Sequence, residues 1–460
     1  MTEIYKLIKL NRLFVYFIYI APVIFVATFT GDGVGDLLPI WTSIVVILIS
    51  TYGIMARTEI PFSLAKIVST FSFLFLGIVP IVTYKYSIDY WDAGPFTSSD
   101  YLLANSVIIC SLILFNLTYS FFHQKSKHSA TLEKNELTES VYEGNIGLYL
   151  VAISSLICIY IYYLNGFDIF NVWTRGKLGD RTNVVEYGQI QYLFVSFLLT
   201  PMLSINLLLY GMARKKSQFI FFILTLLLIL TAPPTAMPRF AAAAMYFPLI
   251  LWYFKIFQKK YVFPMSLIFS VLLIFPLLEI FRYTLTNLSD ISMLALFLSL
   301  FTGGHLDSYQ SLMVILKDGT VTYGFQLIGA LLFFLPRDLW PDKPIGSGQF
   351  MAEKLNYSFH NISANYLSEG YINFGYFGIL LFVFVLAKFC GHFDAIWQTG
   401  RLIGPPRRIA TYLIILPLLF FTLRGDLMSS CAFIFGFVFA IYILDAIISL
   451  SNKRSPFRSR

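Results

Sequence analysis

Charged side chains are scarce in this sequence. Asp, Glu, Lys and Arg together make up 13% of the 460 residues, whereas apolar residues make up 57%. A soluble domain of this length could not keep so much apolar surface from aggregating, so the balance excludes a soluble globular fold. We expect lipid to surround most of the chain.

Cysteine is also scarce. The four cysteines are Cys110, Cys158, Cys390 and Cys431, and no two of them form a Cys-x-x-Cys pair. This pattern indicates neither a disulfide framework nor a zinc site. The first outer loop lacks an Asp-x-Asp pair, so we expect no metal and no other cofactor. The net charge of +8 is distributed as a membrane-orientation signal, which argues against nucleic acid as a partner.

Apolar stretches of about 20 residues are long enough to cross a bilayer as helices. Twelve can be drawn, which predicts an all-α, polytopic integral membrane protein with a single membrane domain over 1–460. The predicted spans are 13–30, 39–56, 67–84, 101–122, 145–164, 189–212, 217–235, 240–257, 261–283, 371–390, 409–423 and 427–450.

In this topology, the loops that are rich in Lys and Arg alternate with loops that are poor in them. With both termini in the cytoplasm, 22 of the 33 basic residues fall on the cytoplasmic side, as the positive-inside rule requires. The eleven that fall outside call for another explanation. They are Lys85, Arg175, Lys177, Arg181, Arg239, Arg282, Lys317, Arg337, Lys343, Lys354 and Arg424.

Two of the predicted outer loops are long, 165–188 and 284–370. The second contains two apolar stretches of about 13 residues, 291–303 and 324–336, which are too short to span comfortably. We expect them to form short interfacial helices on the outer face. No internal repeat is visible, which weakens the case for a transporter built from inverted repeats.

The densest polar segment runs from 335 to 375. Arg337 offers a planar fork of donors suited to a diphosphate, and Lys343 adds a second, point-like cation. The alternative is an interfacial turn in which Arg337 pairs with Asp338 or anchors to lipid headgroups.

Four further arginines are candidate phosphate ligands. Arg239 and Arg424 each occupy a turn at the outer end of a helical hairpin, where an arginine is costly unless partnered. Arg424 has an alternative partner in its neighbour Asp426. Arg175 and Arg181 lie in the first long outer loop, where nearby acids could equally leave them as ordinary solvated charges.

Glu369 and His305 are the leading candidates for a catalytic acid or base. Glu369 opens a helix, where low access to water would raise its pKa, although a glutamate there also complements the helix dipole. His305 follows two glycines and precedes Asp307, but it could equally be an ordinary hydrogen-bonding residue. The remaining outward candidates are Asp307, Asp338 and His360.

Several of these motifs resemble one family. PRDLWPDKP (336–344), followed by EGYINFGYFG (369–378) and a spanning helix, is similar to the Wzy-type oligosaccharide repeat-unit polymerases, or O-antigen polymerases. The placement of Pro-Arg at 238–239 and of LRGD at 423–426 is similar to that family too. The resemblance covers most of the topology but only around 40 residues of motif.

This resemblance implies a C-type membrane glycosyltransferase of the bacterial inner membrane with a periplasmic active site. Its substrates would be undecaprenyl-diphosphate-linked oligosaccharides, and membrane lipids and a chain-length regulator would be its further partners. The growing glycan would pass to a sugar hydroxyl of the incoming repeat unit. An O-antigen ligase and a flippase or transporter of lipid-linked oligosaccharide are the alternatives.

Overall fold

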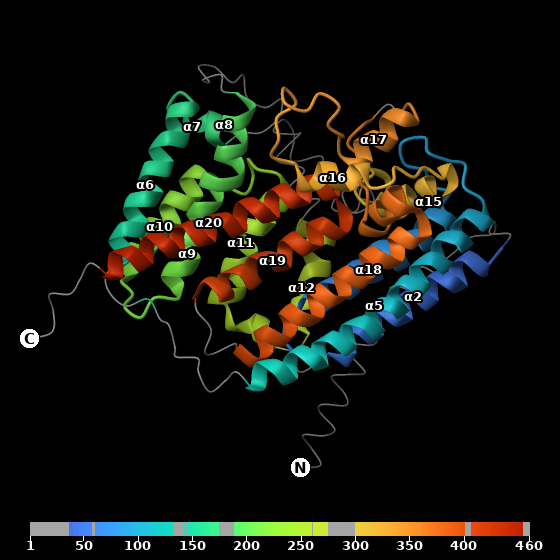
Figure 1. The fold of residues 1–460 in the computed structure, drawn as a ribbon, viewed down its shortest axis with the longest axis horizontal. Helices are drawn as coiled ribbons and strands as arrows, with labels where there is room; N and C mark the ends of the chain where they lie inside the picture. The colour runs from blue at the N-terminus through green and yellow to red at the C-terminus, as the bar shows by residue number, and fades with distance from the viewer. Residues whose placement is uncertain are drawn as a thin grey trace, which may run out of the picture.

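The protein is described here by a computed structural model. It describes residues 36–57, 60–132, 142, 146–173, 188–259, 261–274, 300–357, 359–400 and 406–453. These residues form an all-α fold (Figure 1). The first predicted span, 13–30, lies outside them.

Eight helices in this part of the chain are long and apolar enough to cross a membrane, so the protein is a polytopic membrane protein. In element terms they are α2 (Leu38–Ala56), the run of α3 (Leu64–Phe71), η1 (Ser72–Ile78) and α4 (Val79–Lys85), α5 (Ser98–Leu132), α6 (Ile146–Leu164), the run of α8 (Gln189–Phe194), η4 (Val195–Leu199) and α9 (Thr200–Gly211), α18 (Tyr366–Gly400), α19 (Pro406–Arg424) and α20 (Leu427–Lys453).

Three other predicted spans coincide with shorter helices. These are α10 (Gln218–Thr231), α11 (Arg239–Tyr253) and α12 (Val262–Phe269), which η6 (Ser270–Ile274) continues. With 14 residues, α10 is shorter than a perpendicular crossing needs. The total of twelve spans therefore stays a prediction.

The remaining helices are short and connect the long ones. They are α7 (Ile169–Trp173), η5 (Lys255–Gln258), α15 (Ser308–Asp318), α16 (Phe325–Leu331) and α17 (Ser347–Lys354). The last three fall in the second predicted long loop, and α16 lies within its apolar stretch 324–336.

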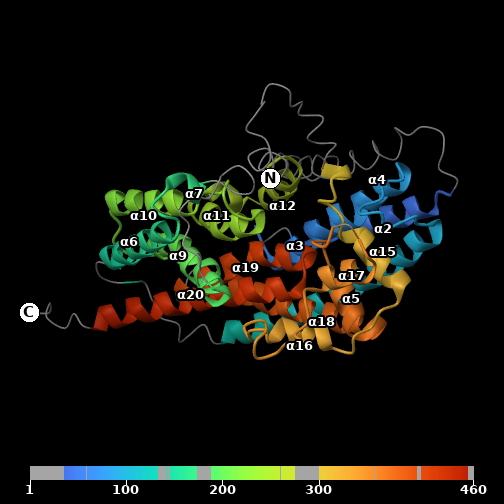
Figure 2. The same cartoon turned by 90° about the horizontal axis from the view of Figure 1, so that it is seen from above.

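The helices form two groups on either side of α19. In Figures 1 and 2, α6, α9 and α10 lie together on one side, and α2, α5 and α18 lie together on the other. Helices α5 and α18 run side by side in both views. Their contact is close because Gly391 has no side chain: a Cβ there would lie 2.9 Å from the Tyr119 carbonyl oxygen.

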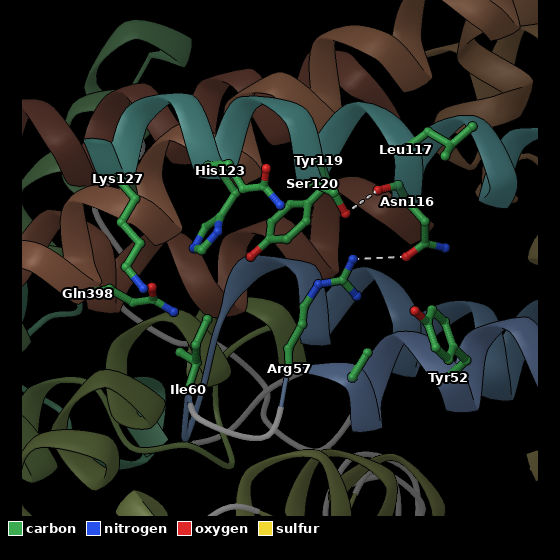
Figure 3. Close-up of a pocket in the computed structure, with 12 residues that line it drawn as sticks. Tyr52, Arg57, Ile60, Asn116, Leu117, Tyr119, Ser120, His123, Lys127 and Gln398 are labelled. Carbon is green, nitrogen blue, oxygen red and sulfur yellow. Dashed lines mark hydrogen bonds between the residues drawn. The ribbon is translucent and has the colours of Figure 1, made fainter. Parts of the chain in front are cut away.

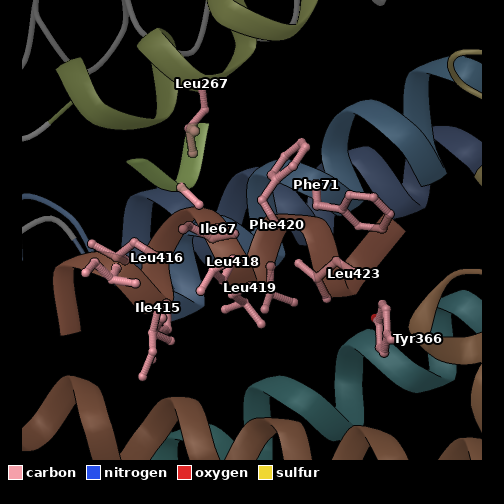
Figure 4. Close-up of a cluster of buried hydrophobic side chains, with 14 of the residues drawn as sticks. Ile67, Phe71, Leu267, Tyr366, Ile415, Leu416, Leu418, Leu419, Phe420 and Leu423 are labelled. Atoms are coloured by element: carbon pink, nitrogen blue, oxygen red, sulfur yellow. The ribbon is translucent and has the colours of Figure 1, made fainter. Parts of the chain in front are cut away.

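The core between the groups is built from α3 and α19 (Figure 4). Phe71 and Phe420 are buried and meet edge to face, with ring centroids 5.8 Å apart. Leu267 of α12 reaches the same cluster. Helix α3 is completely buried, so it is the central element around which the other helices pack.

Helix α18 is a hairpin of two helical arms. It begins at Tyr366, five residues before the predicted span, because the Asn365 side chain caps it by accepting from the Leu367 and Ser368 N–H groups. The helix breaks at Phe374 and Gly375. Gly375 has φ 64°, a left-handed conformation that glycine adopts without strain.

Gly370 and Gly378 show that the chain folds back at this break. In a straight helix, residues eight apart are separated by about 12 Å. Here a Cβ on Gly370 would lie only 2.8 Å from the Gly378 carbonyl oxygen. The last carbonyl groups of the first arm have no partner within the helix. A residue outside the arm supplies one, since the Thr322 N–H donates to the Ile372 carbonyl at 2.7 Å.

We predict that Gly378→Ala destabilises the protein, because the new methyl group would overlap the Gly370 carbonyl. The expected loss is about 1–3 kcal/mol, as for other overpacked sites. Thermal unfolding in detergent measures it as a lower melting temperature. Gly188→Ala is the matched control, since nothing lies within 4 Å of a Cβ there. Equal melting temperatures for the two variants would contradict the hairpin contact.

Candidate functional site

A cleft of about 540 Å³ lies where five separate parts of the chain meet. These are the loop before α5, the turn between α10 and α11, the segment before α15, the segment after α17, and the turn between α19 and α20. Three predicted site residues line it: Arg239, His305 and Arg424. Every one of these segments lies on the side that the sequence predicts to be outward.

Arg239 is the first residue of α11. Pro238 precedes it with φ −55°, a value that the proline ring imposes and that suits the entry into a helix. The next residue, Phe240, packs on Phe421 of α19 with ring centroids 4.7 Å apart. This aromatic contact holds the α10–α11 turn against the end of α19 and brings Arg239 into the cleft that Arg424 lines.

Arg424 ends α19 and is held by Asp307. One guanidinium nitrogen, Nη2, lies 3.3 Å from Asp307 Oδ1. The carboxylate is only 2% exposed, and it also accepts from Ser363 through the backbone N–H at 3.0 Å and the hydroxyl at 2.7 Å. The predicted alternative partner, Asp426, is occupied elsewhere: it caps α20 by accepting from the Ser429 N–H at 2.9 Å.

The rest of the Arg424 guanidinium lies over the Phe240 ring, 5.6 Å from its centroid. Its Nε is buried and has no hydrogen-bond partner among the described residues. The Arg424 side chain as a whole is 21% exposed, so it still offers positive charge to an anionic ligand in the cleft.

His305 lies in a tight turn that glycines make possible. Gly304 has φ 72°, and a Cβ there would overlap the ring of Trp91. Trp91 in turn stacks on Phe359, with ring centroids 4.5 Å apart and planes inclined at 20°. Both rings line the cleft, and Phe359 is exposed, so the cleft combines cations with an aromatic wall.

Glu369 lies behind the cleft and does not line it. It is 2% exposed and accepts from the Ser347 hydroxyl at 2.9 Å and from the Leu427 N–H at 2.8 Å. Leu427 is the first residue of α20. Glu369 therefore ties the hairpin of α18 and the start of α17 to the α19–α20 turn that carries Arg424.

Arg337 and Lys343 lie in a turn outside the cleft. Arg337 Nη1 donates to the Lys343 carbonyl at 2.8 Å, and Lys343 Nζ donates to the Phe333 and Leu335 carbonyls at 2.6 and 2.8 Å. Burial, followed by the nearby positive charge of Arg337, lowers the pKa of Lys343. These contacts hold the segment in a turn.

The other predicted residues are more scattered. Arg175 and Arg181 lie outside the described residues, and Asp338 and His360 are exposed and do not line the cleft. Two further outward lysines form surface ion pairs: Lys354 with Asp318 at 2.6 Å, and Lys317 with Asp100 at 3.9 Å.

Trp91 and Ser363 are site residues that the sequence did not single out. Trp91 follows Tyr90 in a short polar loop, and this aromatic pair is the one local signal that could have indicated a ligand surface. The indole Nε1 of Trp91 is buried without a hydrogen-bond partner in the described structure. Ser363 carries no signal, because its role depends on Asp307, 56 residues earlier.

Comparisons with protein-family models, curated proteins and solved structures give no match for this chain. Within the described residues, no group of three or more His, Cys, Asp and Glu side chains could hold a metal ion. The fold and the site thus define a polytopic α-helical membrane protein with a cationic cleft lined by aromatic rings.

We predict that Asp307→Ala destabilises the protein strongly, because Ser363 and Arg424 would both lose their acceptor. Each buried donor left unpaired costs about 1–3 kcal/mol. Melting temperatures in detergent measure the loss, with Asp338→Ala as an exposed control. The double variant Asp307→Ala/Arg424→Ala should lose less than the two single variants together, and strict additivity would contradict the ion pair.

Proposed function

We propose that this protein is a membrane glycosyltransferase that joins lipid-linked repeat units, as the oligosaccharide repeat-unit polymerases do. One observation carries the proposal. Arg239, His305 and Arg424, singled out separately in the sequence, line a single cleft although 185 residues separate the first from the last. The resemblance of the surrounding motifs to that family supports the same function.

The two arginines would bind the diphosphate of an undecaprenyl-diphosphate-linked donor. In this reaction the bond between the anomeric carbon and the diphosphate oxygen breaks, and the departing lipid diphosphate takes the electron pair. Negative charge therefore grows on the leaving oxygen in the transition state. Guanidinium groups fixed beforehand stabilise that charge most in a site with little water.

His305 would act as the general base. The acceptor is a sugar hydroxyl of the incoming repeat unit, whose oxygen forms the new bond to the anomeric carbon while its proton passes to the imidazole. His305 lines the cleft together with both arginines, whereas Glu369 is buried behind it. We therefore assign Glu369 a positioning role, through its contact with the first residue of α20.

The aromatic wall would hold the sugars. Phe359 presents an exposed ring beside the cations, and Asn361 adds an exposed amide close by in the same cleft lining. Aromatic faces stack on the apolar faces of sugar rings, while amides bind their hydroxyl groups. This combination suits a glycan linked to a diphosphate better than it suits a simple inorganic anion.

We predict that Arg239→Ala and Arg424→Ala each lower the rate of chain lengthening by about 100-fold or more, the loss seen when a donor to a developing oxyanion is removed. His305→Ala should lower it comparably by removing the base. The measurement uses purified protein in detergent with an undecaprenyl-diphosphate-linked oligosaccharide, and product lengths are resolved on a gel.

Arg337→Ala is the matched control. It removes an arginine from the same predicted outer face but outside the cleft, so activity should stay within about threefold of the wild type, as for an exposed charge. Normal product ladders from Arg239→Ala and Arg424→Ala at equal amounts of folded protein would overturn the proposed function.

A further inference from the structure

A second polar cavity, of about 420 Å³, lies between α2, the C-terminal part of α5 and the end of α18 (Figure 3). The proposed transferase does not use it. Its lining is Tyr52, Ala56, Arg57, Ile60, Asn116, Leu117, Tyr119, Ser120, His123, Gln124, Lys127 and Gln398.

This cavity and the cleft lie toward opposite ends of α5. Trp91, in the cleft, belongs to the loop before the first residue of α5, Ser98. Ser120 lies 22 residues further along the helix, which corresponds to about 33 Å and thus to the thickness of a hydrocarbon core. The predicted topology places this end of α5 on the cytoplasmic side of the membrane.

Arg57 is held in the cavity by three contacts. Its Nη1 donates to the Gly53 carbonyl at 2.7 Å, and its Nη2 donates to Asn116 Oδ1 at 2.9 Å. The guanidinium lies over the Tyr119 ring, 4.3 Å from the centroid. A guanidinium has five N–H groups, so donors remain for a ligand, and these contacts fix their direction in advance.

The ring under Arg57 is itself fixed. The Tyr119 hydroxyl donates to Asp394 Oδ2 at 3.1 Å, and Asp394 also accepts from Tyr412 and from the Leu64 and Ala65 N–H groups. Asp394 is fully buried and does not line the cavity. Four hydrogen-bond donors therefore stabilise the Asp394 carboxylate, and it forms no ion pair with Arg57 in the described structure.

The lining of the cavity is cationic. Lys127 projects from the same helix as His123, and both line the cavity; Figure 3 shows Lys127 beside Gln398 and the Tyr119 ring between His123 and Arg57. His123 Nε2 is buried without a hydrogen-bond partner among the described residues. None of the described residues that line the cavity carries a carboxylate.

We propose that this cavity binds a phosphate ester group, either on an anionic phospholipid headgroup or on a soluble phosphate compound. Arg57 supplies oriented N–H donors, Lys127 supplies a second positive charge further along the lining, and His123 and Asn116 add polar groups to the same cavity. A site at the end of membrane-crossing helices with this charge is at the level where lipid phosphates lie.

The test measures binding to the delipidated full-length protein in detergent, with dioleoyl phosphatidylglycerol, dioleoyl phosphatidylcholine and inorganic phosphate as probes. The wild type should bind the glycerol lipid better than the choline lipid. Arg57→Gln/Lys127→Gln should weaken that binding by about 30-fold, given the usual contribution of each basic residue near anionic lipid. Lys215→Gln/Lys216→Gln removes the same charge from an exposed loop, so it should leave the affinity unchanged.

Arg57 also bonds to α2, so its replacement could disturb folding. Lys127→Gln alone removes an exposed lysine and should weaken binding while the melting temperature stays that of the wild type. Displacement of the lipid by inorganic phosphate would identify a soluble phosphate ligand, and binding of the lipid alone would identify a headgroup. Equal affinities for the wild type, Lys127→Gln and the exposed-loop control would overturn the proposal.

Discussion

The arrangement of the cleft depends on one buried carboxylate, that of Asp307. It joins three parts of the chain: its own segment before α15, the extended segment that holds Ser363, and the end of α19 with Arg424. A guanidinium in a largely apolar protein is unfavourable unless it is paired, and breaking such a pair is costly because a charge remains uncompensated. Asp307 therefore allows Arg424 to lie in the cleft.

Hydropathy predicted the long helices well because lipid imposes their length. α2 and α6 begin and end within one residue of the predicted spans, and α20 begins at the predicted residue. The hairpin of α18 was missed, since a break inside an apolar run leaves the mean hydropathy unchanged. Asn365 and Gly375 were the available local signals: one is a preferred helix cap, and the other permits the left-handed turn.

From the sequence, the candidate site was predictable only as separate residues on the predicted outer side: the cations Arg239 and Arg424, and His305. The positive-inside rule singled out Arg239 and Arg424 because the predicted topology places each on the side that basic residues usually avoid. The ion-pair partner of Arg424 could not be predicted in the same way. Asp426 is nearest to Arg424 in the sequence, but it caps α20, and the ion pair is made by Asp307, 117 residues away. The Arg337 side chain, prominent in the sequence, bonds to the Lys343 carbonyl in a turn outside the cleft.

Acids and cations take different places in this fold, and the reason is physical. Asp394 and Glu369 are buried at the N-terminal ends of α3 and α20, where free backbone N–H groups satisfy a carboxylate without a cation. The five N–H groups of a guanidinium are harder to satisfy together inside an apolar protein, and Arg57, Arg239 and Arg424 lie at cavities that ligands or water can reach. Both polar cavities are consequently cationic, Arg239 and Arg424 in one and Arg57 in the other. The described lining of one cavity has no carboxylate, and Asp426 in the other already caps α20, so a ligand that complements either cavity carries negative charge.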